Sequence, residues 1–504
     1  MKQLLSATLD GIDAKPVDVE TTFTKGLPAF GIVGLASSSI QEAKERVKAA
    51  LLTNGFSFPP LRITVNLSPS DLQKTGSHMD LAIALAIALQ NDETSFDNLY
   101  IFGELGLDGR LKDTRSIFPI LLSLKNQNLV SKAMVPVASL DKLSLIPGIT
   151  YIGVENLAEA IAICRNEQEP KEVEATPIEG ERITVDGREF FFLREYPEDF
   201  YDVKGQEVAK RAALIAAAGM HNILMEGSPG CGKSMIAKRL RYILPPISLE
   251  EILQMNQYAL LGGEEPLFVP LRPFRAPHHS SSKPSIFGGG SSRAKIGEVA
   301  LAHGGILFFD EFPHFAKSVL EALREPLQDH RVLISRVNSK ISYATRFMFV
   351  AAQNPCPCGN LLSTTHSCRC SEVEVRRYKQ RISDPLLDRI EIYVQMQDSH
   401  PDDQPSITSE QMHQEVIHAF MRQMKRGQKH LNGKLDEKEI ETFCRLEPEA
   451  ETLLSRAIQR FGLSHRSVAN VKKVARTIAD LDAKERIQKE HVLEALSFRR
   501  REGV

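Results

Sequence analysis

The sequence predicts an α/β protein made of two α/β blocks and a helical C-terminal region. Short apolar runs rich in β-branched residues alternate with amphipathic helical stretches over most of the 504 residues, and this alternation is typical of βαβ units. After residue 398 only helical periodicity remains. At about 100–200 residues per domain, the length agrees with three domains.

The first block is expected over residues 1–164. Its helix at Ser39–Leu52 places apolar residues on one face, as helical spacing requires. Its strands are predicted at Arg62–Leu67, Ala133–Ala138 and Ile149–Val154. In residues 165–199, eleven acidic residues face five basic ones and periodicity is lost, so a domain linker is expected there.

The second block is expected over residues 200–398. Its strands Asn222–Gly227, Gly305–Glu311 and Phe347–Asn354 are almost wholly apolar, which predicts a parallel sheet covered on both faces. Residues 399–504 form the helical region, and its clearest helix has an apolar stripe made of Val468, Val471, Val474, Ile478 and Leu481.

Composition excludes several classes of protein. With 42% hydrophobic and 25% charged residues, the chain is neither disordered, collagen-like nor a disulfide scaffold. The longest apolar run, Leu81–Leu89, is half of the ~18 residues that a membrane span needs, and the start lacks a signal-peptide core. We therefore expect a cytoplasmic protein without a membrane partner. The net charge of −2 excludes a uniformly basic coat for nucleic acid, although residues 271–300 carry +4.

A phosphate-binding motif follows the first strand of the second block. The pattern GxxxxGK[ST] is matched by Gly227, Ser228, Pro229, Gly230, Cys231, Gly232, Lys233 and Ser234. The glycines let backbone N–H groups converge on phosphates, Lys233 neutralises their charge, and the Ser234 hydroxyl ligates Mg²⁺. The sequence thus predicts binding of ATP with Mg²⁺.

Four further positions predict hydrolysis of the nucleotide. A predicted strand ends in Asp310 and Glu311. Asp310 is expected to hold Mg²⁺, and Glu311 is expected to polarise the attacking water. Asn354 ends another strand and can orient that water. Arg389 is suited to stabilising charge on a transferring phosphoryl group, although an exposed ion pair is the alternative.

Four of the seven cysteines lie close together, at Cys356, Cys358, Cys368 and Cys370. Two pairs of thiolates are typical of a structural Zn²⁺ site, and reduced free thiols are the alternative. Cys231 is read as a tolerated small residue of the phosphate loop, and Cys164 and Cys444 as isolated thiols.

Together these motifs resemble the AAA+ ATPases of the magnesium-chelatase-like ComM/YifB family. The resemblance covers essentially the whole chain and rests on FGIVGLASSSIQEAKERVKAAL, RITVNLSPSDLQKTGS, GELGLDGRL, DVKGQEVAKRA, GSPGCGKS, RPFRAPHHSSS, GEVALAHGGILFFDE, LREPLQD, NPCPCG, CRCS, RISDPLLDRIE and VARTIADL. It implies a Lon-like N-terminal domain, an AAA+ core with a parallel sheet, and a C-terminal helical lid. It also implies a hexameric ring that acts as a branch-migration motor on DNA during natural transformation, with recombination proteins as further partners.

The resemblance assigns roles to single residues. Asn354 takes the sensor-1 position, Arg389 the arginine finger that completes a neighbour's site, and Arg466 the sensor-2 position, where the flanking residues depart from the family pattern. Residues 272–290 become a loop facing the pore. The runs VLISR and ISYATRF, on either side of Val337–Lys340, are read from their own pattern as a hairpin that presents Arg336 and Lys340 in the same way, and solvated loop cations are the alternative for each basic residue. The basic residues expected to track DNA phosphates are Arg272, Arg275, Lys283, Arg293, Lys295, Arg336 and Lys340.

The N-terminal block resembles the proteolytic domain of Lon-type proteases but lacks their chemistry. His78 stands at the position of the Lon serine, with Ser77 one place earlier, and Phe118 stands at the position of the lysine base. Without a Ser–Lys pair no nucleophile is activated, which predicts a non-proteolytic domain. Two other functions stay open: a chelatase-type motor that remodels a protein partner for metal insertion, and a protein unfoldase.

Overall fold

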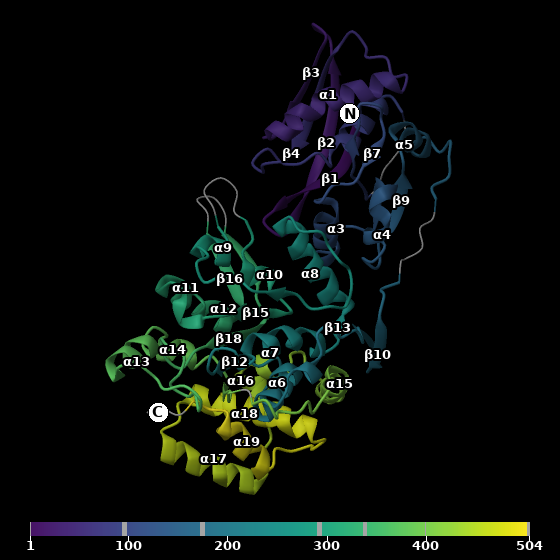
Figure 1. Cartoon of the computed structure of the whole chain (residues 1–504). Coiled ribbons are helices and arrows are strands. Elements are labelled where there is room, and N and C mark those ends of the chain that lie inside the picture. Colours follow the sequence, from purple (N-terminus) through teal and green to yellow (C-terminus); the bar gives the residue numbers. More distant parts are fainter. Residues whose placement is uncertain are drawn as a thin grey trace. The chain divides into compact units, whose positions relative to one another are not determined.

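The computed structural model describes residues 2–92, 98–171, 177–289, 295–335, 340–398 and 400–500 (Figure 1). The chain divides into two compact units. The N-terminal unit comprises Met1–Ile178 and Asn256–Phe268, and the C-terminal unit comprises Glu179–Met255 and Val269–Val504. The N-terminal unit therefore includes a short segment that the sequence places inside the second block.

A seven-stranded mixed sheet organises the N-terminal unit, in the order β3-β4-β2-β1-β5-β8-β9. Its strands are β1 (Lys2–Asp10), β2 (Asp13–Thr24), β3 (Ala29–Val33), β4 (Arg62–Ser68), β5 (Leu99–Ile101), β8 (Lys132–Pro136) and β9 (Thr150–Val154), beside a small ribbon of β6 (Glu104–Leu105) and β7 (Leu111–Lys112). Its helices are α1 (Ser38–Thr53), α2 (Asp80–Ala88), α3 (Ile117–Asn126), α4 (Leu140–Leu143) and α5 (Leu157–Cys164). Residues Asp80–Ile87 of α2 are all buried, so the longest apolar run of the sequence is a core helix.

A five-stranded parallel sheet forms the centre of the C-terminal unit, in the order β14-β15-β18-β12-β19. Its strands are β12 (Ile223–Glu226), β14 (Phe274–Arg275), β15 (Ile306–Phe309), β18 (Met348–Gln353) and β19 (Ile392–Gln395). All residues of β12 and β15 are buried, which confirms the fully apolar strands as core strands. Because the strands are parallel, their carboxyl ends meet at one edge of the sheet.

Helices surround this sheet and continue into the C-terminal region (Figure 1). The helices before residue 399 are α6 (Glu207–Gly219), α7 (Lys233–Leu240), α9 (Lys283–Phe287), α10 (Glu298–Leu301), α11 (Lys317–Ala322), α12 (Arg324–Asp329), α13 (Glu372–Lys379) and α14 (Asp384–Leu387). α8 (Leu249–Gly262) begins in the C-terminal unit and ends in the N-terminal unit. Those after it are α15 (Ser409–Lys425), α16 (Glu437–Phe443), α17 (Pro448–Phe461), α18 (His465–Leu481) and α19 (Lys489–Ser497). Val471 and Ile478 of α18 belong to the same hydrophobic core as Ile223 and Val350 of the sheet. The C-terminal helices and the sheet thus share one core.

The acidic stretch expected to be a linker contains regular structure. Strands β10 (Glu181–Val185) and β11 (Arg188–Phe192) form a hairpin that pairs with β13 (Ile247–Ser248). Phe190 and Val185 are buried, and the Phe190 ring packs edge-on against Phe420 with ring centroids 4.9 Å apart. The excess of acidic side chains, most of which are exposed, concealed these alternating apolar positions in the sequence.

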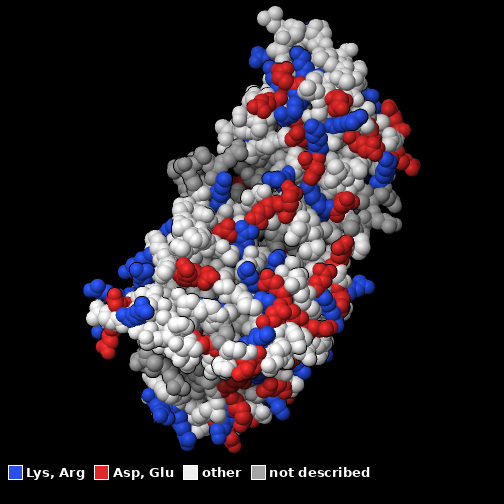
Figure 2. All heavy atoms as spheres, in the orientation of Figure 1, with Lys and Arg blue, Asp and Glu red and all other residues white. Residues whose placement is uncertain are grey.

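Figure 2 shows basic and acidic side chains interspersed over the face in view. A second hairpin, β16 (Arg331–Ser335) with β17 (Lys340–Ala344), occupies the region predicted from the sequence. Across the described ranges, no helix combines the length and apolar character that crossing a membrane requires.

Candidate functional site

The phosphate-binding motif forms a loop between the carboxyl end of β12 and the start of α7. Gly230 and Gly232 adopt left-handed backbone angles, with φ of 82° and 95°, which side chains larger than glycine disfavour. Gly227 has no room for a side chain, since a Cβ there would lie 2.7 Å from the Cys231 sulfur. The loop therefore brings backbone N–H groups to the N-terminus of α7, where the helix dipole favours an anion.

Four of the predicted residues converge at this loop. The Lys233 ammonium donates hydrogen bonds to the carbonyl oxygens of Gly227 at 2.6 Å and Ser228 at 2.9 Å, and to Asn354 Oδ1 at 3.2 Å. The Ser234 hydroxyl donates to Asp310 Oδ2 at 2.9 Å. A hydroxyl beside a carboxylate supplies the oxygen ligands that Mg²⁺ prefers, so this donor set fits the ion.

Glu311 lies next to Asp310 in a strained turn. It adopts a left-handed conformation with φ of 51°, an arrangement that costs of order 1–3 kcal/mol and clusters at functional sites. Its carboxylate is half exposed and lies 3.3 Å from Nδ1 of His279 and 3.5 Å from Nδ1 of His314. Neither contact was predicted from the sequence. His279 lies 32 positions before Glu311, so no local spacing indicates that they meet, whereas His314 lies only three positions after it.

Arg389 and Arg466 lie together but apart from the phosphate loop. Both guanidinium groups donate to Oε1 of Gln328, Arg466 at 3.0 Å. Arg389 follows α14, and its backbone carbonyl accepts a 2.9 Å hydrogen bond from the side chain of Asn222, which directly precedes β12. The phosphate loop follows the other end of β12, so Arg389 belongs to the opposite edge of the sheet. Gln328 carried no signal in the sequence.

The four clustered cysteines meet in space. Their sulfur atoms all lie within 4.8 Å of one another, and the three distances among Cys356, Cys358 and Cys368 are 3.4, 3.6 and 3.6 Å. A tetrahedron with Zn–S bonds of about 2.3 Å has sulfur–sulfur edges of about 3.8 Å. The donor set and its spacing therefore fit a structural Zn²⁺ ion. Hydrogen bonds from the backbone of Arg369 and Asn360 lower the pKa of the Cys358 thiol to about 6.

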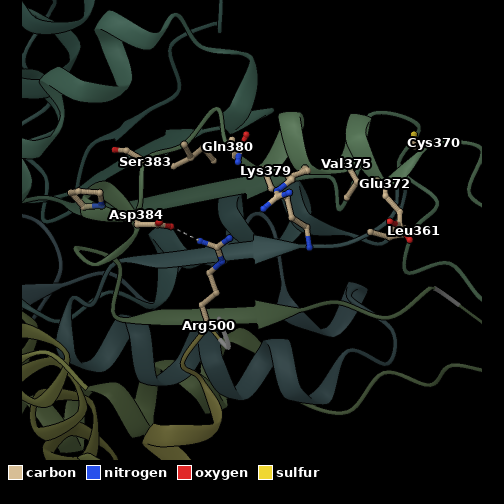
Figure 3. Close-up of a pocket in the computed structure, with 12 residues that line it drawn as sticks. Leu361, Cys370, Glu372, Val375, Lys379, Gln380, Ser383, Asp384 and Arg500 are labelled. Atoms are coloured by element: carbon tan, nitrogen blue, oxygen red, sulfur yellow. Dashed lines mark ion pairs between the residues drawn. The ribbon is translucent and has the colours of Figure 1, made fainter. Parts of the chain in front are cut away.

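An open pocket of about 770 Å³ lies near the cysteines and away from the phosphate loop. Figure 3 shows α13 along one wall, with Cys370 at the opposite end from Asp384 and with Arg500 reaching toward Asp384. The Arg500 and Asp384 side chains form an ion pair at 3.6 Å. The pocket therefore adjoins the segment that carries Arg389, not the predicted nucleotide site.

The basic residues expected to track phosphates have different surroundings. The prediction is wrong for Arg272, which is buried and donates to the carbonyl oxygens of Pro245, Pro246 and Gly304. Arg275 pairs with Glu298 at 2.6 Å. Lys283 and Lys295 are exposed. Arg293, Arg336 and the side chain of Lys340 lie outside the described part of the chain.

The Lon-like positions hold groups that are already satisfied. His78 is buried, with Nε2 2.9 Å from the Ala7 carbonyl oxygen and Nδ1 2.9 Å from Ser116 Oγ, and burial lowers its pKa to about 4. Phe118 is buried and packs edge-on against Phe268 with ring centroids 5.0 Å apart. Ser77 donates to Glu104. These contacts favour a structural role for His78 and Phe118, which stand at the two positions that a Lon protease needs for catalysis.

Comparison with known families defines the class of protein. A family model described as magnesium chelatase, subunit ChlI, matches residues 199–404. Models of subunit ChlI of Mg-chelatase and of the C-terminal part of subunit ChlI match residues 19–139 and 406–499. With the parallel sheet and the phosphate loop, these matches define a magnesium-chelatase-like AAA+ ATPase.

Individual relatives identify the family within this class of ATPases. The chain is 36% identical to the competence protein ComM of Haemophilus influenzae over 500 residues, which covers 97% of this chain and 95% of the relative. It is 36% identical over 504 residues to the uncharacterized protein YifB of Escherichia coli, with the same coverage. The archaeal Lon protease of Methanothermobacter thermautotrophicus is 43% identical over 60 residues, 12% of this chain and 9% of that protein. The chain belongs to the ComM/YifB family of magnesium-chelatase-like AAA+ ATPases.

Proposed function

We propose that this ATPase is a hexameric motor that moves along DNA in the cytoplasm and drives branch migration when incoming DNA recombines during natural transformation. The observation that carries the proposal is the division of the site between two edges of one sheet. Lys233, Ser234, Asp310 and Asn354 meet at one edge, whereas the backbone of Arg389 is fixed at the other. Roughly 13 Å of strand separates the two edges, so the arginine serves the site of a neighbouring subunit.

Each residue at the phosphate loop has a separate task. Lys233 holds the β- and γ-phosphates, and Ser234 with Asp310 holds Mg²⁺, which neutralises charge on the transferring phosphoryl group. Glu311 orients the attacking water and accepts its proton, and His279 and His314 restrict the carboxylate to one side. Asn354 fixes the water against the γ-phosphate. Arg389 of a neighbour stabilises the developing charge, and Arg466 supports it through Gln328.

DNA as the substrate is supported by family membership and by exposed cations. The relative from Haemophilus influenzae is named a competence protein, and competence is the uptake of DNA. Lys283 and Lys295 are exposed near a loop that the family resemblance places at the ring pore. Recombination proteins are the further partners that such a motor needs.

The four-cysteine cluster is proposed to hold one structural Zn²⁺. Its sulfur spacing matches a closed tetrahedral site, in which no position is left for a substrate.

A chelatase-type motor is the second candidate function. Three family models that match this chain are named for a magnesium-chelatase subunit, and they cover both units. Such a motor remodels a protein partner and has no need of DNA.

ATP turnover with and without DNA separates the two candidates. The purified full chain is assayed with Mg²⁺ alone and with single-stranded, duplex or forked DNA. A DNA motor hydrolyses ATP several times faster with at least one of these DNAs. The proposal is contradicted if none of these DNAs changes the rate of ATP turnover and if the chain also fails to bind them in a filter or anisotropy assay. That result favours the chelatase-type motor.

A further inference from the structure

The loop that carries the four cysteines is joined to the phosphate loop. Residues 354–371, between β18 and α13, form neither helix nor strand. Loops of more than about 12–15 residues without regular structure are uncommon in compact domains and need some other source of order. The cysteine sulfurs lie at both ends of this loop, so one ion held by them closes it.

Three contacts connect this cysteine loop to the nucleotide site. The first is the hydrogen bond of 3.2 Å between Asn354 Oδ1 and the Lys233 ammonium. The second is at Gly359, which packs so closely on the phosphate loop that a Cβ there would lie 2.6 Å from Cδ of Pro229. Gly359 also donates a backbone hydrogen bond of 3.0 Å to the carbonyl oxygen of Cys356, so the cysteines set its position.

Asp398 makes the third contact by joining the two loops. Its carboxylate accepts hydrogen bonds from Ser363 Oγ at 2.7 Å and from the Thr364 backbone N–H at 2.8 Å, within the cysteine loop. It also accepts one from the side chain of Ser228 in the phosphate loop. The Ser363 bond is the largest cause that lowers the pKa of Asp398 to about 2. The bridge is therefore charged throughout the neutral range.

From these contacts we infer that Zn²⁺ bound by Cys356, Cys358, Cys368 and Cys370 braces the phosphate loop, so that loss of the ion weakens nucleotide binding. The inference rests on the proposed zinc site but not on DNA or on assembly into a ring. Zinc release removes the ion that joins the four sulfur atoms and so frees Gly359 and Asn354 from their positions. The ion then controls how tightly the site binds ATP.

Zinc content and nucleotide affinity, measured on the same full-length protein, test the inference. The chain is purified without chelators, and zinc is counted by elemental analysis. Binding of a fluorescent ATP analogue with Mg²⁺ is then measured before and after removal of zinc by a zinc-selective chelator. We expect one zinc per chain, a loss of affinity of at least tenfold on its removal, and recovery when zinc is returned. Circular dichroism checks that the stripped protein stays folded.

Substitutions at two glycines distinguish the effect of the cysteine loop on the phosphate loop from the binding of zinc. Gly359→Ala keeps all four cysteines but places a methyl group against Pro229, so we expect full zinc content with weakened nucleotide binding. Gly427→Ala is the matched control, because Gly427 has nearly the same φ, 79° against 83°, with nothing within 4 Å of an added Cβ. Absence of zinc overturns the zinc site. Zinc whose removal leaves affinity unchanged overturns the brace, and neither result bears on DNA-dependent turnover.

Discussion

Lys233 and Arg389 carry the same charge, but their surroundings suit them to different tasks. Lys233 is nearly buried among the carbonyl oxygens of its own loop, where it can act only on a phosphate bound there. Burial, followed by repulsion from Arg466 and Arg324, lowers the pKa of Arg389. Arg389 and Arg466 both donate to Gln328, and the role that we propose for Arg389 is to meet an anion, the nucleotide of an adjacent subunit.

Replacement of Arg389 tests whether Lys233 serves nucleotide binding and Arg389 serves hydrolysis. We expect Arg389→Ala to bind ATP about as well as the unchanged chain and to hydrolyse it roughly 10³-fold more slowly, which is the scale reported for arginine fingers. Lys233→Ala should fail at binding. Binding is measured with a fluorescent ATP analogue and turnover by phosphate release.

Mixing the two variants tests whether the arginine acts on a neighbour. Where a subunit with an intact phosphate loop meets one with an intact arginine, a complete site is restored, so a mixture of Arg389→Ala and Lys233→Ala chains should recover part of the turnover. Full turnover by Arg389→Ala alone would show that the arginine has no catalytic role. Inactive mixtures of variants that do assemble would show that it acts within its own chain.

At the scale of elements, β12 connects the two halves of the site. Its carboxyl end leads into the phosphate loop, and Asn222 before its other end donates to the Arg389 carbonyl at 2.9 Å. The same side chain accepts from the Phe349 backbone at 2.9 Å and from the Lys434 ammonium at 3.2 Å. The amide of Asn222 supplies both the N–H donor and the accepting oxygen that these contacts use.

Asn222→Asp preserves the shape of this side chain and removes the donor to Arg389. It also places a carboxylate beside the buried Glu391, which accepts from the Asn222 backbone at 2.8 Å. We expect turnover to fall at least tenfold while affinity for ATP stays within about twofold. In the Arg389→Ala background the same change should cost nothing more, as single-turnover hydrolysis of radiolabelled ATP can resolve. If the fold-losses in turnover of the two single variants multiply in the double variant, Asn222 acts independently of Arg389.

Local sequence patterns predicted the strands that end in the residues of the nucleotide site. The apolar strands β12, β15 and β18 and the residues that follow them were identifiable, because parallel strands buried on both faces have unbroken apolar runs. The hairpin β10–β11 was missed because it lies in a stretch, residues 165–199, that has eleven acidic and five basic side chains and no sustained periodicity. The contacts of Gln328 and His279 were missed because they join residues that only the fold brings together.

At the scale of the whole molecule, a net charge of −2 hides opposing local charges. Residues 331–390 carry ten basic and four acidic side chains, whereas residues 165–199 carry five and eleven. On the face in Figure 2 the two signs alternate instead of forming one basic surface. In the DNA motor that we propose, particular basic loops, and not one basic face, would contact DNA.

Buried histidines predict how the stability of the folded chain depends on pH. Burial lowers the pKa of His78, His303 and His413 to about 4 and that of His330 to about 3. Their unfolded pKa is 6.5, so the unfolded chain binds more protons between these values, and stability falls as pH decreases from about 6.5 to 4. Each histidine contributes on the order of 1 kcal/mol per pH unit.

Thermal unfolding followed by circular dichroism from pH 8 to 5 measures this effect. The midpoint should stay level above pH 7 and fall below about pH 6.5. His78→Gln, which keeps a donor and an acceptor but does not titrate, should show a shallower fall than the unchanged chain. A midpoint that is independent of pH over this range would mean that these histidines titrate equally in both states.

Movement of a DNA junction tests the central claim most directly. A synthetic four-way junction with a fluorophore and a quencher on separable arms is incubated with the full chain, ATP and Mg²⁺. The account predicts that the arms separate at a rate that depends on ATP hydrolysis, and that Glu311→Gln binds ATP and the junction but moves nothing. A chain that hydrolyses ATP and leaves the junction intact, or a Glu311→Gln chain that moves it as fast as the unchanged one, would contradict the account.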